Sequence, residues 1–94
     1  MIVIREVFVA KPGMAGKMAK MMKSVMQGMP NFQGRVLTDM TGQFNRVVLE
    51  TELENLSAFE QRMKDYAQNA SLREKMSGYA EMYKTGKREI FQII

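Results

Sequence analysis

The stretch MAGKMAKMMKSVMQGMP, residues 14–30, decides the fold, because the spacing of apolar residues changes there from that of a strand to that of a helix. Apolar side chains recur every three or four residues and form one stripe, which consists of Met14, Met18, Met21, Met22, Val25 and Met29. Lysines at 17, 20 and 23 fall on the opposite side. We therefore predict a crossover helix that packs its methionines on a sheet and turns its lysines to water.

Six of the eleven methionines of the chain lie in this one stretch. Methionine is flexible and polarisable, so it suits either an irregular core or the wall of an adaptable pocket. The sequence favours core filling. Replacement of Met18 and Met22 by leucine should be tolerated in a core and should alter ligand choice in a pocket.

Strands are predicted on both sides of this helix. Residues 2–10, IVIREVFVA, are β-branched and aromatic, and Lys11-Pro12-Gly13 ends the run. Residues 32–41 and 44–53 form a hairpin around Gly42-Gln43. In the second hairpin strand Val47, Leu49, Thr51 and Leu53 share one face, and Arg46, Val48, Glu50 and Glu52 share the other.

Two capping-box patterns predict the second helical region. Ser57 with Glu60 begins a helix over 57–68, and Ser71 with Glu74 begins another over 72–83. Gly86 is expected to end the second piece, and residues 87–94, KREIFQII, form the last strand.

The element order β-α-β-β-α-β predicts one α+β domain over residues 1–94, with a ferredoxin-like, four-stranded antiparallel sheet and both helices on one face. The other sheet face would be bare, yet the first and last strands carry apolar residues on both faces. An exposed apolar sheet is a liability for a monomer. We therefore expect a homodimer with its sheets packed face to face.

Composition excludes several classes of function. The chain has no histidine and no cysteine, which removes the usual neutral acid–base residue, thiol chemistry and the commonest metal ligands. We therefore expect no metal site. No apolar run approaches the length of a membrane span, and a cytoplasmic location is expected. The net charge of +4 comes from the N-terminal half, but the lysines lack interleaved aromatic residues, so neither nucleic acid nor membrane binding is expected.

Four turn and packing segments carry a resemblance that covers essentially the whole chain. They are Lys11-Pro12-Gly13, Met29-Pro30-Asn31-Phe32-Gln33-Gly34, Glu54-Asn55-Leu56-Ser57-Ala58-Phe59 and Asn69-Ala70-Ser71-Leu72-Arg73. With them the chain resembles the small dimeric α/β-barrel proteins of the antibiotic-biosynthesis monooxygenase and NIPSNAP-like type. The resemblance implies a homodimeric barrel with a cavity between sheet and helices in each subunit. None of these segments is catalytic, so they support the fold more than a reaction.

Activities differ within that group. Some members oxygenate polycyclic aromatic compounds without metal or flavin, and others bind and degrade haem with an asparagine, a tryptophan and a histidine. Here Glu6 stands at the asparagine position, and the chain has no tryptophan or histidine. The resemblance therefore implies neither haem degradation nor any other cofactor.

Two sets of residues are candidates for a site. Glu6, Arg46 and Glu50 are catalytic candidates, since charges on neighbouring central strands could orient or deprotonate an acidic phenol; the alternative is a structural ion pair across the dimer. The ligand-binding candidates are Met18, Met22, Phe59, Met63, Tyr66, Tyr79 and Tyr83, which lie on helical stripes. Core packing with hydroxyl groups at the rim is the alternative for the tyrosines.

Two functions follow from these candidates. The first is binding of a small apolar or aromatic molecule between sheet and helices, with or without cofactor-independent monooxygenase-like chemistry. The alternative is a non-enzymatic structural or interaction dimer of the same fold. An apolar cavity of roughly 300 Å³ or more favours the first, and a filled interior favours the second.

Overall fold

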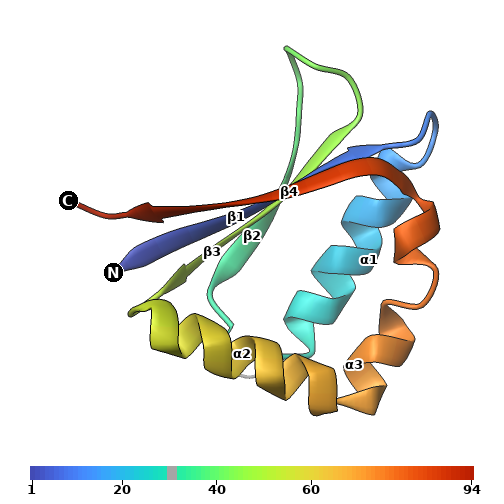
Figure 1. Cartoon of the computed structure of the whole chain (residues 1–94). Helices are drawn as coiled ribbons and strands as arrows, with labels where there is room; N and C mark the ends of the chain where they lie inside the picture. The colour runs from blue at the N-terminus through green and yellow to red at the C-terminus, as the bar shows by residue number, and fades with distance from the viewer. Residues whose placement is uncertain (30–31) are drawn as a thin grey trace.

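A computed structural model describes residues 1–29 and 32–94, and the predicted helix exit at Pro30 and the Pro30-Asn31 part of the second matching segment lie outside them. Four strands and three helices follow one another along the chain (Figure 1). Their bounds are β1 Ile2–Ala10, α1 Ala15–Gln27, β2 Gly34–Thr38, β3 Arg46–Leu53, α2 Leu56–Gln68, α3 Ala70–Lys75 and β4 Tyr83–Gln92, with a 3-10 turn at Tyr79–Glu81 before β4.

The four strands form one antiparallel sheet in the order β2-β3-β1-β4, which confirms the ferredoxin-like α+β prediction and the adjacency of β1 and β3. All helices lie on one side of the sheet (Figure 1). Glu6 on β1 pairs with Leu49 on β3, and Arg5 pairs with Glu50. Since directly opposite residues share a face, this register fixes which side chains meet the helices and which lie on the open face.

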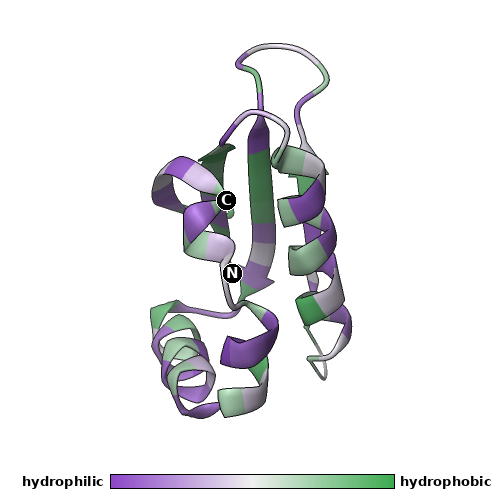
Figure 2. Cartoon of the chain, turned by 90° about the vertical axis from the view of Figure 1, so that its right-hand side faces the viewer, coloured by the Kyte–Doolittle hydropathy of each residue, from purple (hydrophilic) through white to green (hydrophobic). Residues whose placement is uncertain are grey.

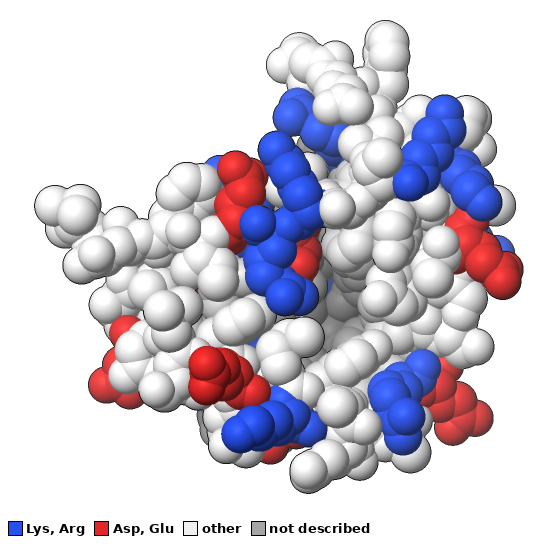
Figure 3. Space-filling view, in the orientation of Figure 1, with Lys and Arg blue, Asp and Glu red and all other residues white. Residues whose placement is uncertain are grey.

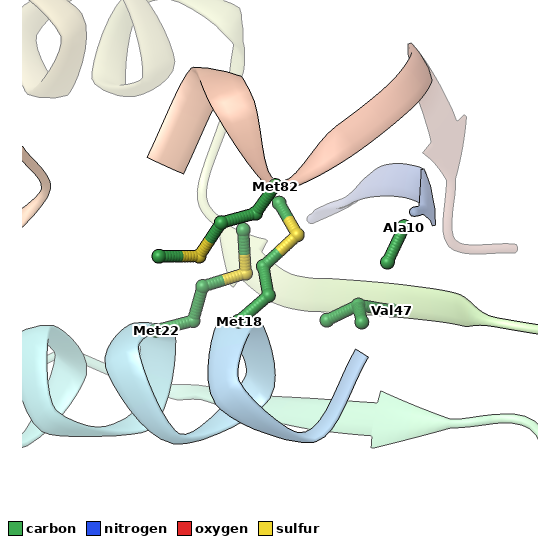
Figure 4. Close-up of a cluster of buried hydrophobic side chains, with 5 residues drawn as sticks. All are labelled: Ala10, Met18, Met22, Val47 and Met82. Atoms are coloured by element: carbon green, nitrogen blue, oxygen red, sulfur yellow. The ribbon is translucent and has the colours of Figure 1, made fainter. Parts of the chain in front are cut away.

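Methionines from two segments close the core on the helix-covered face. Met18 and Met22 of α1 meet Met82, the residue before β4, above Val47 of β3 and Ala10 at the end of β1 (Figure 4). Met18 and Val47 have no exposed surface. The predicted methionine stripe of α1 therefore packs on the sheet, and the helix ribbons in Figure 2 alternate between apolar and polar colour, as amphipathic helices do.

The two helices of the second region begin differently from the prediction. Asn55 caps α2, because its side-chain oxygen accepts a hydrogen bond of 2.9 Å from the amide of Ala58. Asn69 caps α3 in the same way, at 3.1 Å from the amide of Leu72. The predicted serine caps at Ser57 and Ser71 lie inside the helices instead. Asparagine and serine are both favourable cap residues, and the start of each helix has one of each, two residues apart.

The last helix is shorter than predicted, and the last strand begins earlier. A helix over 72–83 does not form, because α3 ends at Lys75 and Gly78 adopts a left-handed conformation with φ of 85°. Gly86 does not stop a helix but lies within β4, where a Cβ atom would come 3.1 Å from the ring of Phe8. A glycine at this position therefore makes room for an aromatic ring from the neighbouring strand.

The hairpin between β2 and β3 has a longer connection than the predicted Gly42-Gln43 turn. Residues 39–45 connect the strands and project from the body of the molecule (Figure 1). Gly42 and Asn45 have positive φ of 97° and 65°. The Asp39 carboxylate accepts a hydrogen bond of 2.9 Å from the Arg46 amide and so closes the loop. Within the described residues, no helix is long and apolar enough to cross a membrane.

Candidate functional site

A cavity of about 200 Å³ lies between the helix-covered face of the sheet and the helices, and Figure 3 shows the surface hollowed there. Its lining is mostly apolar or aromatic and consists of Ile4, Glu6, Phe8, Met22, Val25, Met26, Met29, Phe32, Leu49, Thr51, Phe59, Arg62, Met63, Tyr66, Met76, Tyr79 and Arg88. Most of these residues come from β1, α1 and α2.

The alternation of the strands supplies one wall. Ile4, Glu6 and Phe8 are every second residue of β1, and Leu49 and Thr51 occupy the equivalent face of β3. Glu6 is thus a charged residue in a row that is otherwise apolar. Its side chain therefore needs a partner on this face of the sheet.

That partner is Arg88 on β4, which pairs with Glu6 across the strands. The Arg88 Nε atom donates a hydrogen bond of 2.6 Å to Glu6 Oε1, and the guanidinium lies 5.0 Å from the centre of the Phe59 ring. The Glu6 side chain is 20% exposed and that of Arg88 is 42% exposed. The carboxylate and the guanidinium neutralise each other at the edge of an apolar cavity.

Helix α2 supplies the facing wall. Phe59, Arg62, Met63 and Tyr66 stand at positions i, i+3, i+4 and i+7 and therefore share one helix face. The Arg62 guanidinium lies 4.6 Å from the centre of the Phe32 ring. Burial lowers the pKa of Arg62 from its ordinary value, but an arginine remains a cation at neutral pH.

Aromatic rings close the cavity near the start of β4. The ring of Tyr79 meets that of Phe8 edge to face at 6.4 Å, and Tyr83 packs on Phe8 at 4.9 Å. Burial raises the pKa of the Tyr79 phenol, with a smaller contribution from the neighbouring Tyr83. Tyr79 therefore stays protonated at neutral pH and can donate a hydrogen bond, but it is a poor general base.

An outer groove of about 410 Å³ adjoins the cavity. The two spaces share Met29, Phe32, Arg62 and Tyr66 as lining residues. These four residues therefore stand where the cavity opens into the groove.

Five of the seven predicted ligand-binding residues line the cavity, namely Met22, Phe59, Met63, Tyr66 and Tyr79. Met18 and Tyr83 are not among its described lining residues. Met18 is enclosed in the core, and Tyr83 packs against the rings of Phe8 and Tyr79.

The predicted cluster of Glu6, Arg46 and Glu50 does not form, because the three residues lie on opposite faces of the sheet. Glu6 lines the cavity, whereas Arg46 and Glu50 lie on the open face. Glu50 accepts hydrogen bonds of 2.7 Å from Arg5 Nη2 and 2.7 Å from Arg35 Nε. These two hydrogen bonds, aided by the two positive charges, lower the pKa of Glu50.

The described ion pairs of the open face join residues of the same chain. Arg46 pairs with Asp39, at 3.9 Å between Nε and Oδ2, just as Glu50 pairs with two arginines. These charges hold the sheet and the hairpin loop, and they do not reach the cavity.

Two arginines of the cavity are not among the candidates chosen from the sequence, namely Arg62 and Arg88. Arg62 sits on the same stripe as Phe59 and Met63, and a single arginine within an apolar stripe was the available signal. Arg88 lies within the predicted last strand, but its place beside Glu6 depends on the register of β4 against β1, which the sequence does not reveal. Among residues 1–29 and 32–94, no three side chains of the metal-ligating types His, Cys, Asp and Glu gather at one place.

Comparisons with known proteins find the fold in solved structures. No protein-family model and no curated protein matches the chain. A NIPSNAP domain protein from Burkholderia xenovorans superposes with a TM-score of 0.85 at 12% identity and covers 100% of this chain and 95% of its own. A NIPSNAP family protein from Agrobacterium tumefaciens gives a TM-score of 0.84 at 12% identity, over 99% of this chain and 85% of its own.

Two further structures are less similar. An antibiotic biosynthesis monooxygenase-like protein from Deinococcus radiodurans has a TM-score of 0.73 at 11% identity, over 99% of this chain and 92% of its own. A MhuD mutant with two manganese protoporphyrin IX molecules per active site has a TM-score of 0.73 at 15% identity, over 100% of this chain and 95% of its own. At such identities the likeness concerns the fold alone. The chain has the ferredoxin-like α+β fold of the NIPSNAP and antibiotic biosynthesis monooxygenase-like proteins.

Proposed function

We propose that this protein is a homodimer that binds a small apolar or aromatic molecule between sheet and helices. The observation that carries the proposal is the cavity itself, an apolar space bordered by three charged side chains, Glu6, Arg62 and Arg88. Apolar walls with a few convergent polar groups are typical of small-molecule sites.

The size of the cavity limits the ligand. Its 200 Å³ is smaller than the roughly 300 Å³ that a typical ligand pocket has, although the adjoining groove adds space at the opening. An engineered apolar cavity of about 150 Å³ holds one benzene molecule. The space therefore suits a single ring or a short aliphatic chain rather than a polycyclic compound.

A matched pair of core methionines tests the proposal. Met22 lines the cavity and Met18 does not, yet both are buried in the same helix. In a thermal-shift screen of one-ring aromatics, quinones and short fatty acids, Met22→Leu should change which compounds stabilise the protein, and Met18→Leu should not. The absence of any stabilising compound, or the same change in both variants, would contradict ligand binding in this cavity.

Monooxygenase-like chemistry without a cofactor is a narrower form of this proposal. Such a reaction begins with removal of a proton from the substrate, so the site needs a base. Glu6 is the one carboxylate among the described lining residues, which favours it for that role over Arg46 and Glu50. Oxygen uptake with each ligand found by the screen should fall in Glu6→Gln, and oxygen uptake that is unaffected by this change would remove Glu6 from the reaction.

A haem does not fit the residues that are present. The protein has no histidine, and a cavity suited to one ring cannot enclose a porphyrin of four pyrrole rings. We expect no Soret shift when haem is titrated into the protein. A clear shift would contradict this expectation and would reopen haem binding.

The second candidate is a non-enzymatic structural or interaction dimer. The ion pair between Arg88 and Glu6 supports it, because a charged group at the cavity edge is already satisfied without a ligand. A stable dimer in which no tested compound binds would favour this candidate. A cytoplasmic location and the absence of nucleic acid and membrane partners stay predictions.

A further inference from the structure

The cavity contains more positive than negative charge. One carboxylate, that of Glu6, faces the two guanidinium groups of Arg62 and Arg88. Arg88 and Glu6 lie 2.6 Å apart and neutralise each other. Arg62 forms no ion pair with any described residue. The charge of Arg62 is therefore available at the cavity opening.

The two acidic residues that flank Arg62 on α2, Glu60 and Asp65, form no ion pair with it. Asp65 is one helical turn away, but its Oδ1 atom accepts a hydrogen bond of 2.9 Å from the Gln61 side-chain amide. Arg62 instead lies against the ring of Phe32. The electron-rich face of the ring attracts the cation, but the ring offers no hydrogen-bond acceptor to the N–H donors at the edge of the guanidinium.

The position of Arg62 decides which part of a ligand it can reach. Arg62 and Tyr66 border both the cavity and the outer groove and so stand at the opening, whereas Ile4, Phe8 and Leu49 line the cavity alone. A planar guanidinium prefers a carboxylate, because two N–H groups can donate to its two oxygens in parallel. A partly desolvated site strengthens such a pair.

We propose that the ligand is a small monoanion, an aromatic or short aliphatic carboxylic acid whose carboxylate binds Arg62 and whose apolar body fills the cavity. This inference rests on the proposed function and narrows its ligand class. It assigns Arg62 as the specificity residue, whereas Arg88 holds Glu6 in place. A neutral molecule of the same shape would fill the cavity but would leave Arg62 without an anionic partner.

Calorimetric titration with hydrocinnamate and hydrocinnamyl alcohol tests the assignment, since the two probes differ only in the charged end. The wild-type protein should bind the acid about tenfold more tightly than the alcohol, the effect of one charge-assisted contact. Arg62→Met, which keeps an apolar stem, should bring the two affinities to within about twofold of each other. Arg73→Met makes the same change on α3, outside the described cavity and groove linings, and should keep the wild-type preference.

The possible results distinguish the role proposed for Arg62 from the proposal that the cavity binds a ligand. If the wild-type protein binds acid and alcohol equally, or if Arg62→Met keeps the preference, the role of Arg62 is overturned while ligand binding in the cavity stands. If neither probe nor any other one-ring compound binds, the proposed function itself is overturned. Should Arg62→Met fail to fold, titrations of the wild-type protein at low and high salt decide: the acid must lose affinity with salt and the alcohol must not.

Discussion

Glu50 shows what a charge on the open sheet face does for the molecule. Its side chain is 11% exposed, and Arg5 and Arg35 hold it from both sides. In the folded protein its pKa lies below the ordinary 4.5, so its ionisation stabilises the fold above that pH. This stabilisation should be lost as the pH falls below about 4.5 and passes through the lower pKa that Glu50 has in the folded protein.

Replacement of Glu50 by glutamine should therefore lower the free energy of unfolding by only about 1 kcal/mol at neutral pH, since water reaches the side chains of Arg5 (39% exposed) and Arg35 (69% exposed). The loss should shrink at acid pH. Urea unfolding at several pH values measures this effect. Glu52→Gln, at an exposed position of the same strand, serves as the control and should change little. An equal effect in both variants would contradict the ion-pair explanation.

Gly34 lies at a position of the sheet that has no room for a side chain. A Cβ atom there would lie 2.8 Å from Phe32 Cε1, 2.8 Å from Thr51 Cγ2 and 2.9 Å from the backbone oxygen of Glu50. Gly34→Ala should destabilise the protein by about 1–3 kcal/mol, because a backbone atom cannot move aside easily.

Gly16→Ala is the matched control for that change. Outside the neighbouring residues and the backbone of its own helix, no atom lies within 4 Å of a Cβ atom at Gly16, so alanine should stabilise the protein by up to about 1 kcal/mol. Thermal unfolding of both variants measures the two effects. Equal and small shifts would show that the space around Gly34 is not restrictive.

At the scale of the element, the helix caps can be tested by mutation, because the structure has asparagine caps where the sequence pattern predicted serine caps. Asn55→Ala and Asn69→Ala should each lower the free energy of unfolding by about 1 kcal/mol, because each removes the acceptor for a free helix amide. Ser57→Ala and Ser71→Ala remove the residues that the capping-box pattern favoured and should stay within about 0.5 kcal/mol of the wild type. Chemical denaturation of the four variants decides, and a larger loss in the serine variants would contradict the observed caps.

The elements themselves could largely be predicted from the sequence. The strand over 2–10 has the predicted bounds, and the methionine helix packs its stripe on the sheet, because both have a strong and unbroken periodicity. The second helical region was less predictable. Its length depends on the left-handed Gly78, and a glycine can equally mark a loop, a cap or a contact within a strand.

The candidate site could be predicted on its helical side and not on its sheet side. The stripe of Phe59, Met63 and Tyr66 follows from helix spacing alone. The sheet side depends on the register of the strands, and a shift of one residue moves a side chain to the other face. Glu6 pairs with Leu49 and not with Glu50, so Glu6 and Glu50 lie on opposite faces of the sheet. No local pattern in the sequence reveals that pairing.

At the scale of the whole molecule, the two faces of the sheet have different compositions. The helix-covered face holds the core and the cavity. On the open face, Leu37, Val48 and Val7 form an apolar row across three strands, and Lys87 of β4 ends that row. The next row alternates in charge and consists of Arg35, Glu50, Arg5 and Glu89. Because that row has no net charge, it would not repel the same row of a second copy that approached this face.

The homodimer prediction is best tested at the centre of this face. Val48 lies between Leu37 and Val7, so Val48→Lys would place a charge in the middle of the apolar row. We expect light scattering to give the mass of two chains for the wild type and of one chain for Val48→Lys, since an unpaired charge in an interface is costly. Leu56→Lys introduces the same charge at an exposed apolar residue of α2 and should leave the dimer intact.

The folded state of each variant must be verified by circular dichroism, so that loss of the dimer is not confused with unfolding. A wild type that scatters as one chain at micromolar concentration would refute the dimer directly. A Val48→Lys protein that remains folded and dimeric would place the interface elsewhere. In either case the cavity lies on the opposite face of the sheet, so ligand binding would still have to be judged by its own titrations.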